Sequence, residues 1–185
     1  MHEPLKKNLA EGIWVKISKL DAARRQIDTA IRLYFGRRDD VSIHTLGSAA
    51  LGVIDSLLVK AGHPETMPLD NVRPEYLGEM RRLLHEDANF FKHADRDPES
   101  VLHFKPEMNE FVLVRCLGGY HLLSGERTEE MMIFQTWMTV WMPEVFFQDP
   151  ASPIVQSARR TYERSTPGRF YMDMKRGFAA NNAAP

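Results

Sequence analysis

The sequence predicts an all-α, single-domain bundle of five or six helices. Its 185 residues match the size of one ordinary domain. Hydrophobic residues make up 43% of the chain and charged residues 26%, which is typical of a globular protein with a buried core. Apolar residues recur at helical spacing along most of the chain, and no alternating strand pattern competes with them. We expect the helical domain to cover 1–176, with 1–17 loosely packed, and 177–185 to form a frayed tail.

The first predicted helix covers 19–35. Ser18, followed three residues later by Asp21, has the form of a capping box at a helix start. Gly36 and the charged residues after it end the helix. The apolar residues between these signals share one helix face: Leu20, Ala23, Ile27, Ala30, Ile31 and Tyr34.

The second predicted helix begins near Asp40 and ends before Gly62. Two glycines, Gly47 and Gly52, lie in its middle. Each glycine costs a helix about 1 kcal/mol relative to alanine. We therefore expect a neighbouring helix to approach this one closely, so that packing offsets the cost.

The third predicted helix covers 74–93. Proline at its first position, Pro74, suits a helix start. The apolar residues that follow recur with helical period: Leu77, Met80, Leu84, Ala88 and Phe91. This helix ends within the most informative stretch of the chain, His85–Asp97, which reads HEDANFFKHADRD.

Helical phasing divides the polar residues of this stretch. At 100° per residue, His85 and Lys92 lie on the flanks of the apolar stripe, whereas Asn89 and His93 point away from it. One interpretation is a polar helix end that faces solvent. The other is a second surface that faces a partner helix or a bound ligand.

Three more helices complete the predicted bundle. Residues 107–123 are apolar on nearly every side, which is typical of a buried central helix. Thr128 caps the next helix, which extends to about 147 with a break at Pro143. The last, shorter helix covers 152–165.

Composition bounds the compartment and the chemistry. The single cysteine, Cys116, excludes an intramolecular disulfide and is expected to be a small buried hydrophobe. No apolar signal-peptide core is visible at the N-terminus. The two most apolar windows, 111–123 and 131–147, are too short and too polar to cross a bilayer. We therefore expect a cytoplasmic protein with no membrane association.

We expect no metal ion and no cofactor. His85 and His93 are eight residues apart, and one metal cannot easily take both from a straight helix. The Glu-x-x-His pairs of a bundle di-iron site do not occur in the sequence. No phosphate-binding glycine loop or nucleophile elbow is present either, so whether the chain is an enzyme stays open.

Three polar residues on the predicted helices are further site candidates. His44 lies near the start of the second helix, where a neutral, hydrogen-bonded imidazole is expected. It serves either as a structural histidine between two close helices or as the centre of a small-ligand pocket. Arg115 and His121 lie within the most apolar helix, so both need partners or a place at the helix edge.

The formal net charge of −1 excludes a chain-wide basic field for nucleic acid. Residues 156–176 are the local exception, with six basic residues against two acidic ones. Tyr162, Phe170 and Tyr171 are interleaved with them, so stacking on single-stranded RNA is an alternative to a solvated basic tail.

Two segments carry a family resemblance. Residues 31–50, which contain SIHTL, and 85–97, which contain NFFKHAD, resemble small bacterial helical proteins with no assigned activity. A more distant resemblance is to HEPN domains, helical bundles that often dimerise and in many cases cleave RNA. Their arginine–histidine motif is matched in spacing by Arg115 and His121, and Asn89, Lys92 and His93 resemble an Asn-x-x-Lys-His string of some relatives. This resemblance implies RNA binding or cleavage at these residues.

The helix after Thr128 combines methionines with large aromatics, among them Trp137, Met138 and Trp141. Core packing is one interpretation, and a homodimer or protein-binding face is the other, because methionine and tryptophan are common at interfaces. We expect the protein to act through homodimerisation or protein binding, with a HEPN-like RNA-binding or RNA-cleaving domain as the alternative.

Overall fold

The computed structural model describes residues 14–63, 86–93, 95, 97–142 and 151–183, and the regular structure within these ranges is entirely helical. This confirms the all-α prediction. Six helices are α2 (Lys19–Phe35), α3 (Asp40–Lys60), α5 (Met108–Ser124), α6 (Glu129–Trp141), α7 (Pro153–Tyr162) and α8 (Pro167–Ala183). Residues 86–90 form a further helical segment, so the described ranges hold seven helical segments where we expected five or six.

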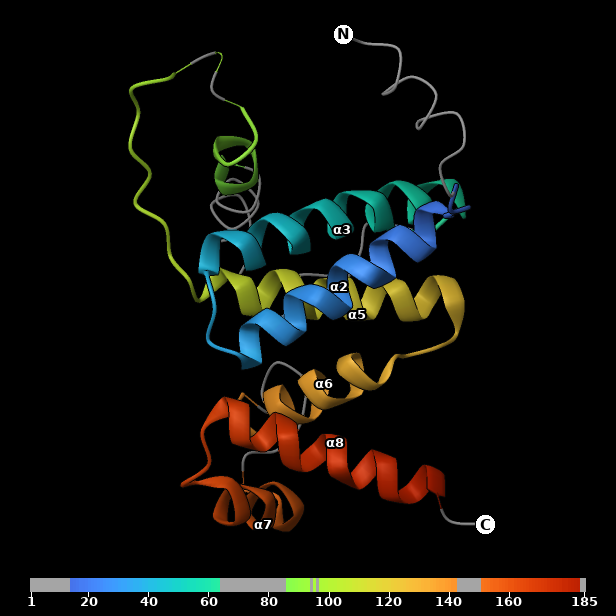
Figure 1. Ribbon diagram of the computed structural model, residues 1–185, viewed down its shortest axis with the longest axis vertical. Helices are drawn as coiled ribbons and strands as arrows, with labels where there is room; N and C mark the ends of the chain where they lie inside the picture. The colour runs from blue at the N-terminus through green and yellow to red at the C-terminus, as the bar shows by residue number, and fades with distance from the viewer. Residues whose placement is uncertain (1–13, 64–85, 94, 96, 143–150, 184–185) are drawn as a thin grey trace, which may run out of the picture.

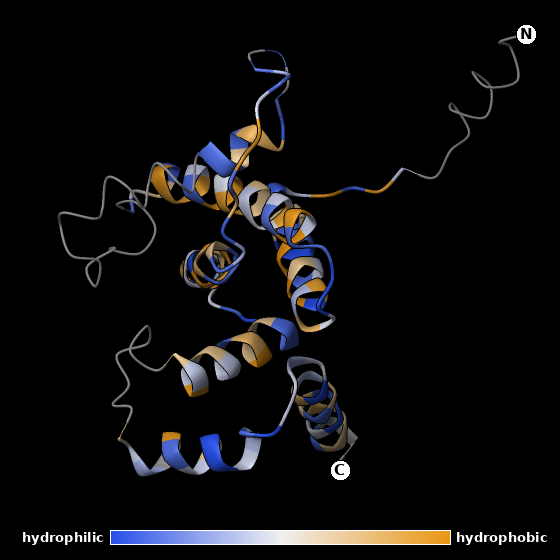
Figure 2. Cartoon of the chain, turned by 90° about the vertical axis from the view of Figure 1, so that its left-hand side faces the viewer, coloured by the Kyte–Doolittle hydropathy of each residue, from blue (hydrophilic) through white to orange (hydrophobic). Residues whose placement is uncertain are grey.

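The helices form two groups that lie one above the other (Figures 1 and 2). α2, α3 and α5 make up one group, in which α3 packs extensively against both α2 and α5. α6, α7 and α8 make up the other, and α6 connects it to α2. The 86–90 segment lies beside α3, on the side away from α6–α8 (Figure 1).

Side-chain caps begin the first two helices where the sequence places them. The Ser18 hydroxyl accepts a hydrogen bond from the Asp21 amide at 3.0 Å. The Asp39 carboxylate accepts one from the Ser42 amide at 2.8 Å. Both satisfy amides that have no partner within the helix, which fixes the starts of α2 and α3.

One of the two α3 glycines confirms the predicted close approach. A Cβ atom added at Gly47 would lie 2.8 Å from Cγ1 of Val112 on α5. A Cβ atom at Gly52 would meet nothing within 4 Å. Close packing therefore explains Gly47, whereas Gly52 lies on the exposed side of α3.

The core runs through both groups of helices. Its largest fully buried side chains come from α2, α3, α5, α6 and α8: Phe35, Ile27, Ile31, Ile43, Ile54, Leu58, Leu113, Met131, Ile133, Phe134, Met138 and Phe170. Phe35, at the end of α2, stacks on Phe170 and Tyr171 of α8 and meets Trp137 of α6 edge-on. This aromatic contact joins the two groups.

The C-terminal part differs from the expectation. α7 ends at Tyr162, and a separate helix, α8, follows from Pro167 to Ala183, so the expected tail at 177–183 is helical instead of frayed. The Thr166 hydroxyl accepts from the Arg169 amide at 3.3 Å at the start of α8, and the helix is held by the fully buried Phe170. The predicted segment 74–85 and the break at Pro143 lie outside the described residues.

Among the described residues, α3 alone is long and apolar enough to cross a membrane. Within the fold its buried side chains pack against α2 and α5, as those of a core helix do. The described parts of the apolar windows 111–123 and 131–147 contain no helix of that kind.

Candidate functional site

Residues 86–93 present two chemically different faces. Asp87 and Ala88 are buried, and Phe91 is half-buried against the bundle. Asn89, Lys92 and His93 are exposed. The phasing argument is confirmed for these residues, because Ala88 and Phe91 lie inward while Asn89 and His93 lie outward.

The outward face lines a pocket. Asn89 and His93, together with Phe90, form part of an open pocket of about 690 Å³. Its other lining residues are Glu86, Asp95, Asp97, Ser100, Val101 and Leu102. The structure therefore brings Asn89 and His93 into one site, whereas Lys92 is not among the lining residues. We call this site the acidic pocket.

Three carboxylates give the acidic pocket its charge, from Glu86, Asp95 and Asp97. The Asp97 carboxylate accepts a hydrogen bond from the Ser100 hydroxyl at 3.0 Å, and the Asp97 carbonyl accepts one from the Ser100 amide at 3.0 Å. These bonds hold the turn that forms one wall. Phe90 and Leu102 add apolar surface. Such a lining attracts a cation with an apolar stem and repels phosphate.

The inward face of the segment covers a buried polar cluster around His44. The His44 side chain is fully buried, and its Nδ1 lies 3.0 Å from Oδ1 of Asn109 on α5. The Asn109 amide nitrogen donates to the Asp40 carbonyl at 3.1 Å, so Oδ1 is left to face His44. Nδ1 of a neutral imidazole therefore carries the proton and donates it, and Nε2 is left as an acceptor.

Nε2 of His44 is buried and has no hydrogen-bond partner among the described residues. The ring makes edge-on contacts with Phe91 and Phe104, at centroid distances of 5.8 and 5.1 Å. Burial lowers the pKa of His44, against the opposing effects of the Asn109 hydrogen bond and the Asp87 charge. The neutral, hydrogen-bonded histidine expected from sequence is thus the form that fits this environment.

Asp87 is the second ionisable member of the cluster. Its side chain is only 3% exposed, and burial raises its pKa, against the attraction of His44. The signal for it was present in the sequence, because position 87 lies three residues after Leu84 and four before Phe91 on the apolar stripe. A carboxylate at a core position is unusual and is a reason to look for a functional site.

The arginine–histidine pair that matches the HEPN spacing, Arg115 and His121, lies on α5 and does not line the acidic pocket. Arg115 forms an ion pair with Asp55 of α3, with the two charged atoms 3.6 Å apart. His121 is half-buried further along α5. The described contacts place Arg115 against α3 rather than against His121. Cys116 is fully buried, its thiol donates to the Gly47 carbonyl at 3.4 Å, and burial raises its pKa, all consistent with the inert thiol we expected.

Two basic residues of the C-terminal segment, Arg159 and Lys175, make contacts within the bundle. The Arg159 side chain donates to the Val140 carbonyl at the end of α6, at 2.7 Å. Lys175 pairs with Glu129 and Glu130 at 3.1 and 3.4 Å. Phe170 is fully buried, which corrects the expectation that it is available to stack on RNA.

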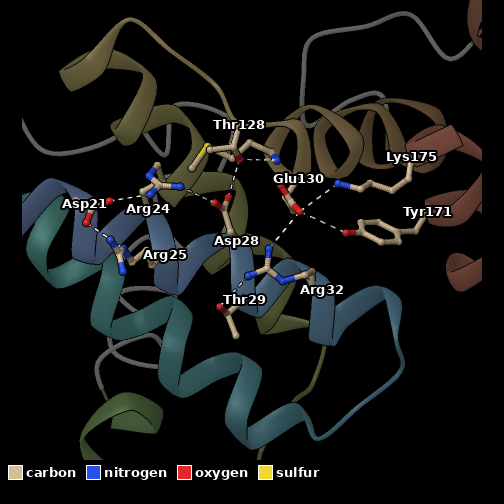
Figure 3. Close-up of polar contacts among 11 residues, drawn as sticks. Asp21, Arg24, Arg25, Asp28, Thr29, Arg32, Thr128, Glu130, Tyr171 and Lys175 are labelled. Atoms are coloured by element: carbon tan, nitrogen blue, oxygen red, sulfur yellow. Dashed lines mark hydrogen bonds and ion pairs between the residues drawn. The ribbon is translucent and has the colours of Figure 1, made fainter. Parts of the chain in front are cut away.

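Figure 3 shows the charged contacts that tie α2, α6 and α8 together. The Glu130 carboxylate accepts from Arg32, Lys175 and the Tyr171 hydroxyl at 3.1, 3.4 and 3.5 Å. Asp28, nearby on α2, accepts from the Thr128 hydroxyl at 2.6 Å. Every one of these groups has a partner within the bundle, so the network is best explained as structural.

The methionine- and tryptophan-rich helix α6 packs mainly into the core. Met138 is 2% exposed, and Trp137 is half-buried against Phe35 and donates to the Tyr34 hydroxyl at 3.2 Å. A groove of about 440 Å³ runs along another side of α6, lined by Met132, Gln135, Thr136, Thr139, Val140, Val155, Ala158 and Phe178. Trp137, Met138 and Trp141 are not among its lining residues.

Among the described residues, no group of three or more histidine, cysteine, aspartate or glutamate side chains is arranged to hold a metal ion. The sequence identified Asn89 and His93 of the acidic pocket but missed its second wall. That wall consists of Asp95, Asp97, Ser100, Val101 and Leu102, which show no periodicity in the sequence, and only the two aspartates marked it.

Comparison of the chain with protein-family models, with curated proteins and with solved structures gives no match in any of the three.

Proposed function

We propose that this protein is a binding protein that recognises a cationic segment of a partner protein in the acidic pocket. The observation that carries the proposal is the position of Asn89 and His93. They lie on the outward face of the 86–93 segment and line a pocket with Glu86, Asp95 and Asp97.

The lining suits a lysine or arginine side chain. The long aliphatic stem of such a residue would pack on Phe90 and Leu102, and its charged end would meet the carboxylates. Asn89 offers both a donor and an acceptor to the backbone of the bound segment. The volume of about 690 Å³ lies in the usual range for pockets that hold a small ligand or a few side chains.

RNA binding is the alternative that follows from the HEPN resemblance. The acidic pocket opposes it, because three carboxylates repel phosphate. Phe170, one of the three aromatic residues proposed for stacking, is fully buried in the core. A basic polypeptide is therefore the favoured ligand, and RNA binding is tested beside it.

The test measures binding of a fluorescent 12-residue lysine- and arginine-rich peptide to the full chain. An acidic peptide of equal length and a single-stranded RNA oligonucleotide serve as comparison ligands. The variant is Asp95→Lys, which reverses one charge at the exposed wall of the pocket. The matched control is Glu163→Lys, an equal charge change at an exposed position after α7.

We expect the basic peptide to bind, and Asp95→Lys to weaken it about tenfold or more, which is about 1.4 kcal/mol. Glu163→Lys should change the affinity by less than about twofold, because its charge is remote and screened by salt. Equal losses in the two variants would show a non-specific charge effect and would overturn the proposal. RNA binding that depends on His93 would overturn it in favour of the alternative.

A further inference from the structure

The buried cluster of His44, Asn109 and Asp87 lies on the other side of the segment that carries the acidic pocket. The inward face of that segment supplies Asp87 and Phe91 to the cluster, while its outward face supplies Asn89 and His93 to the pocket. The two sites therefore share one short piece of chain. A change in how this segment packs on His44 must alter the wall of the pocket.

The hydrogen bond to Asn109 leaves the His44 ring one nitrogen that can take up a further proton. Nδ1 of His44 already carries a proton and donates it to Asn109, so an added proton goes to Nε2. Nε2 is buried and has no acceptor among the described residues. The protonated ring would thus place a charged N–H where nothing receives it, which is costly in a buried site.

Within the part of the chain that the structure describes, few charges act on His44. The 86–93 segment contributes Asp87, which favours the protonated ring, and Lys92, which opposes it. α5 contributes the uncharged Asn109. The coil before α5 contributes the apolar ring of Phe104, which also contacts Phe91. Among the described residues, Asp87 is therefore the counter-charge for a protonated His44, and it lies on the segment that forms the pocket wall.

We infer that His44 is a positioning residue that makes the acidic pocket sensitive to pH. With a neutral ring, Phe91 packs edge-on against His44, Asp87 is buried on the same face of the segment, and the pocket has the shape described here. Protonation of Nε2 requires Asp87 or water to reach it, which displaces the segment and weakens ligand binding. The binding consequence rests on the proposed function, whereas the displacement of the segment does not.

The direction of the pH effect follows from the cluster. The pKa of His44 in the folded protein lies below its usual value of 6.5. The unfolded or detached state therefore takes up protons first, and packing of the segment is strongest above about pH 6.5 and weakens as the pH falls. Asp87 acts in the opposite direction, since its raised pKa favours the folded state once it is protonated at lower pH.

The first readout needs no ligand. The Phe91 amide donates to the Asp87 carbonyl at 3.2 Å, so its hydrogen-exchange protection reports whether the segment is folded in place. We expect that protection factor, corrected for intrinsic exchange, to fall about tenfold from pH 7.5 to pH 5.5, and the Ile54 amide in the centre of α3 to show no such change.

Three variants assign the effect. His44→Gln removes the titrating ring and should abolish the pH dependence. His93→Gln removes the exposed imidazole of the pocket and should leave the pH dependence of the Phe91 protection unchanged. Asp87→Asn keeps the size of the side chain but removes the counter-charge, so the change in protection should move to lower pH. Because His44→Gln affects packing, Asp87→Asn provides the test if that variant does not fold.

The second readout is the affinity for the basic peptide at both pH values in the His93→Gln background. We expect a loss of affinity at pH 5.5 that disappears in the His44→Gln, His93→Gln double variant. Constant Phe91 protection in the unmodified chain, or an unchanged pH profile in Asp87→Asn, would overturn the inference. Protection that depends on pH without any peptide binding would support it and refute the proposed ligand instead.

Discussion

Gly47 and Gly52 show how one residue type has two different roles on the same helix. Both lie within α3, where glycine lowers helix stability. At Gly47 the α5 side chain of Val112 occupies the space that a side chain would need. At Gly52 that space is empty. Interhelical packing therefore requires glycine at position 47 but not at position 52.

Alanine substitutions at these two glycines should have opposite effects. We expect Gly47→Ala to lower the free energy of unfolding by about 1–3 kcal/mol, because the new methyl forces α3 and α5 apart. We expect Gly52→Ala to raise it by about 0.5–1 kcal/mol through helix propensity alone. Urea unfolding followed by circular dichroism measures both, and a stabilised Gly47→Ala would contradict the close packing.

Two buried carboxylates differ in the support that they receive. Asp28 accepts hydrogen bonds from Thr128 and Arg24. For Asp87 no hydrogen bond is found among the described residues, although it is equally buried. Burial raises the pKa of Asp87 and so disfavours its ionised form at neutral pH. Among the described residues, Asp28 is thus the better supported of the two carboxylates.

At the scale of elements, α8 is attached to the bundle by an aromatic cluster and by two carboxylates of α6, of which Glu130 makes more contacts than Glu129. Glu130 of α6 receives Lys175 and Tyr171 from α8 and Arg32 from α2. Burial alone would raise the pKa of Glu130, but its own backbone amide, Lys175 and Arg32 outweigh that effect and lower it. The ionised form is therefore the one that holds α8.

This lowered pKa predicts how the attachment of α8 depends on pH. The stability that Glu130 contributes is present above its ordinary pKa of 4.5 and is lost as the pH falls through the lower folded value. Glu130→Gln should therefore reduce the hydrogen-exchange protection of the α8 amides at pH 7 by about 1–2 kcal/mol. In this variant the protection should also change less as the pH falls into the acid range. Hydrogen exchange measures both effects.

The control for this variant is Glu129→Gln. Glu129 is more exposed than Glu130, and Lys175 is its one ion-pair partner among the described residues. Glu129→Gln should lower the protection of the α8 amides by less than about 1 kcal/mol, because exposed ion pairs contribute little to stability. Equal effects of the two substitutions would show that Glu130 is not the central contact.

The elements that the sequence predicted well are those with local signals. Ser18, Asp40 and Thr128 mark the starts of α2, α3 and α6, because caps and charges act within one turn of a helix. α8 was missed because its stability comes from Phe170 packing on Phe35, a contact between residues far apart in the chain. Helical propensity alone does not report such contacts.

The candidate site was predictable in part for the same reason. Periodicity placed Asn89 and His93 on the outward face, because phasing is a local property. The partners of that face, Asp95 and Leu102, lie on a coil whose path is set by tertiary contacts such as Phe104 against His44. The Asn109 partner of His44 is 65 residues away in sequence, so no spacing rule could connect the two.

At the scale of the whole molecule, an aromatic junction joins the two groups of helices, beside the charged contacts of Arg32 and Asp28. Phe35 of α2 reaches into the second group, where it meets Phe134 and Trp137 of α6 and Phe170 and Tyr171 of α8. The α2–α3–α5 group has extensive packing of its own. α8 packs on α6 and, through this junction, on α2.

Phe170→Ala should therefore separate the stabilities of the two groups. Removing a fully buried phenylalanine costs about 3–5 kcal/mol, a large part of the 5–15 kcal/mol that stabilises a typical domain. We expect hydrogen exchange in α8 to accelerate while the central amides of α3 keep most of their protection, and urea unfolding to show two transitions. Met172→Ala, at a half-exposed position on the same helix, should leave both groups unchanged. An equal loss of protection in α3 and α8 would show instead that the chain unfolds as one cooperative unit and that the junction couples the groups fully.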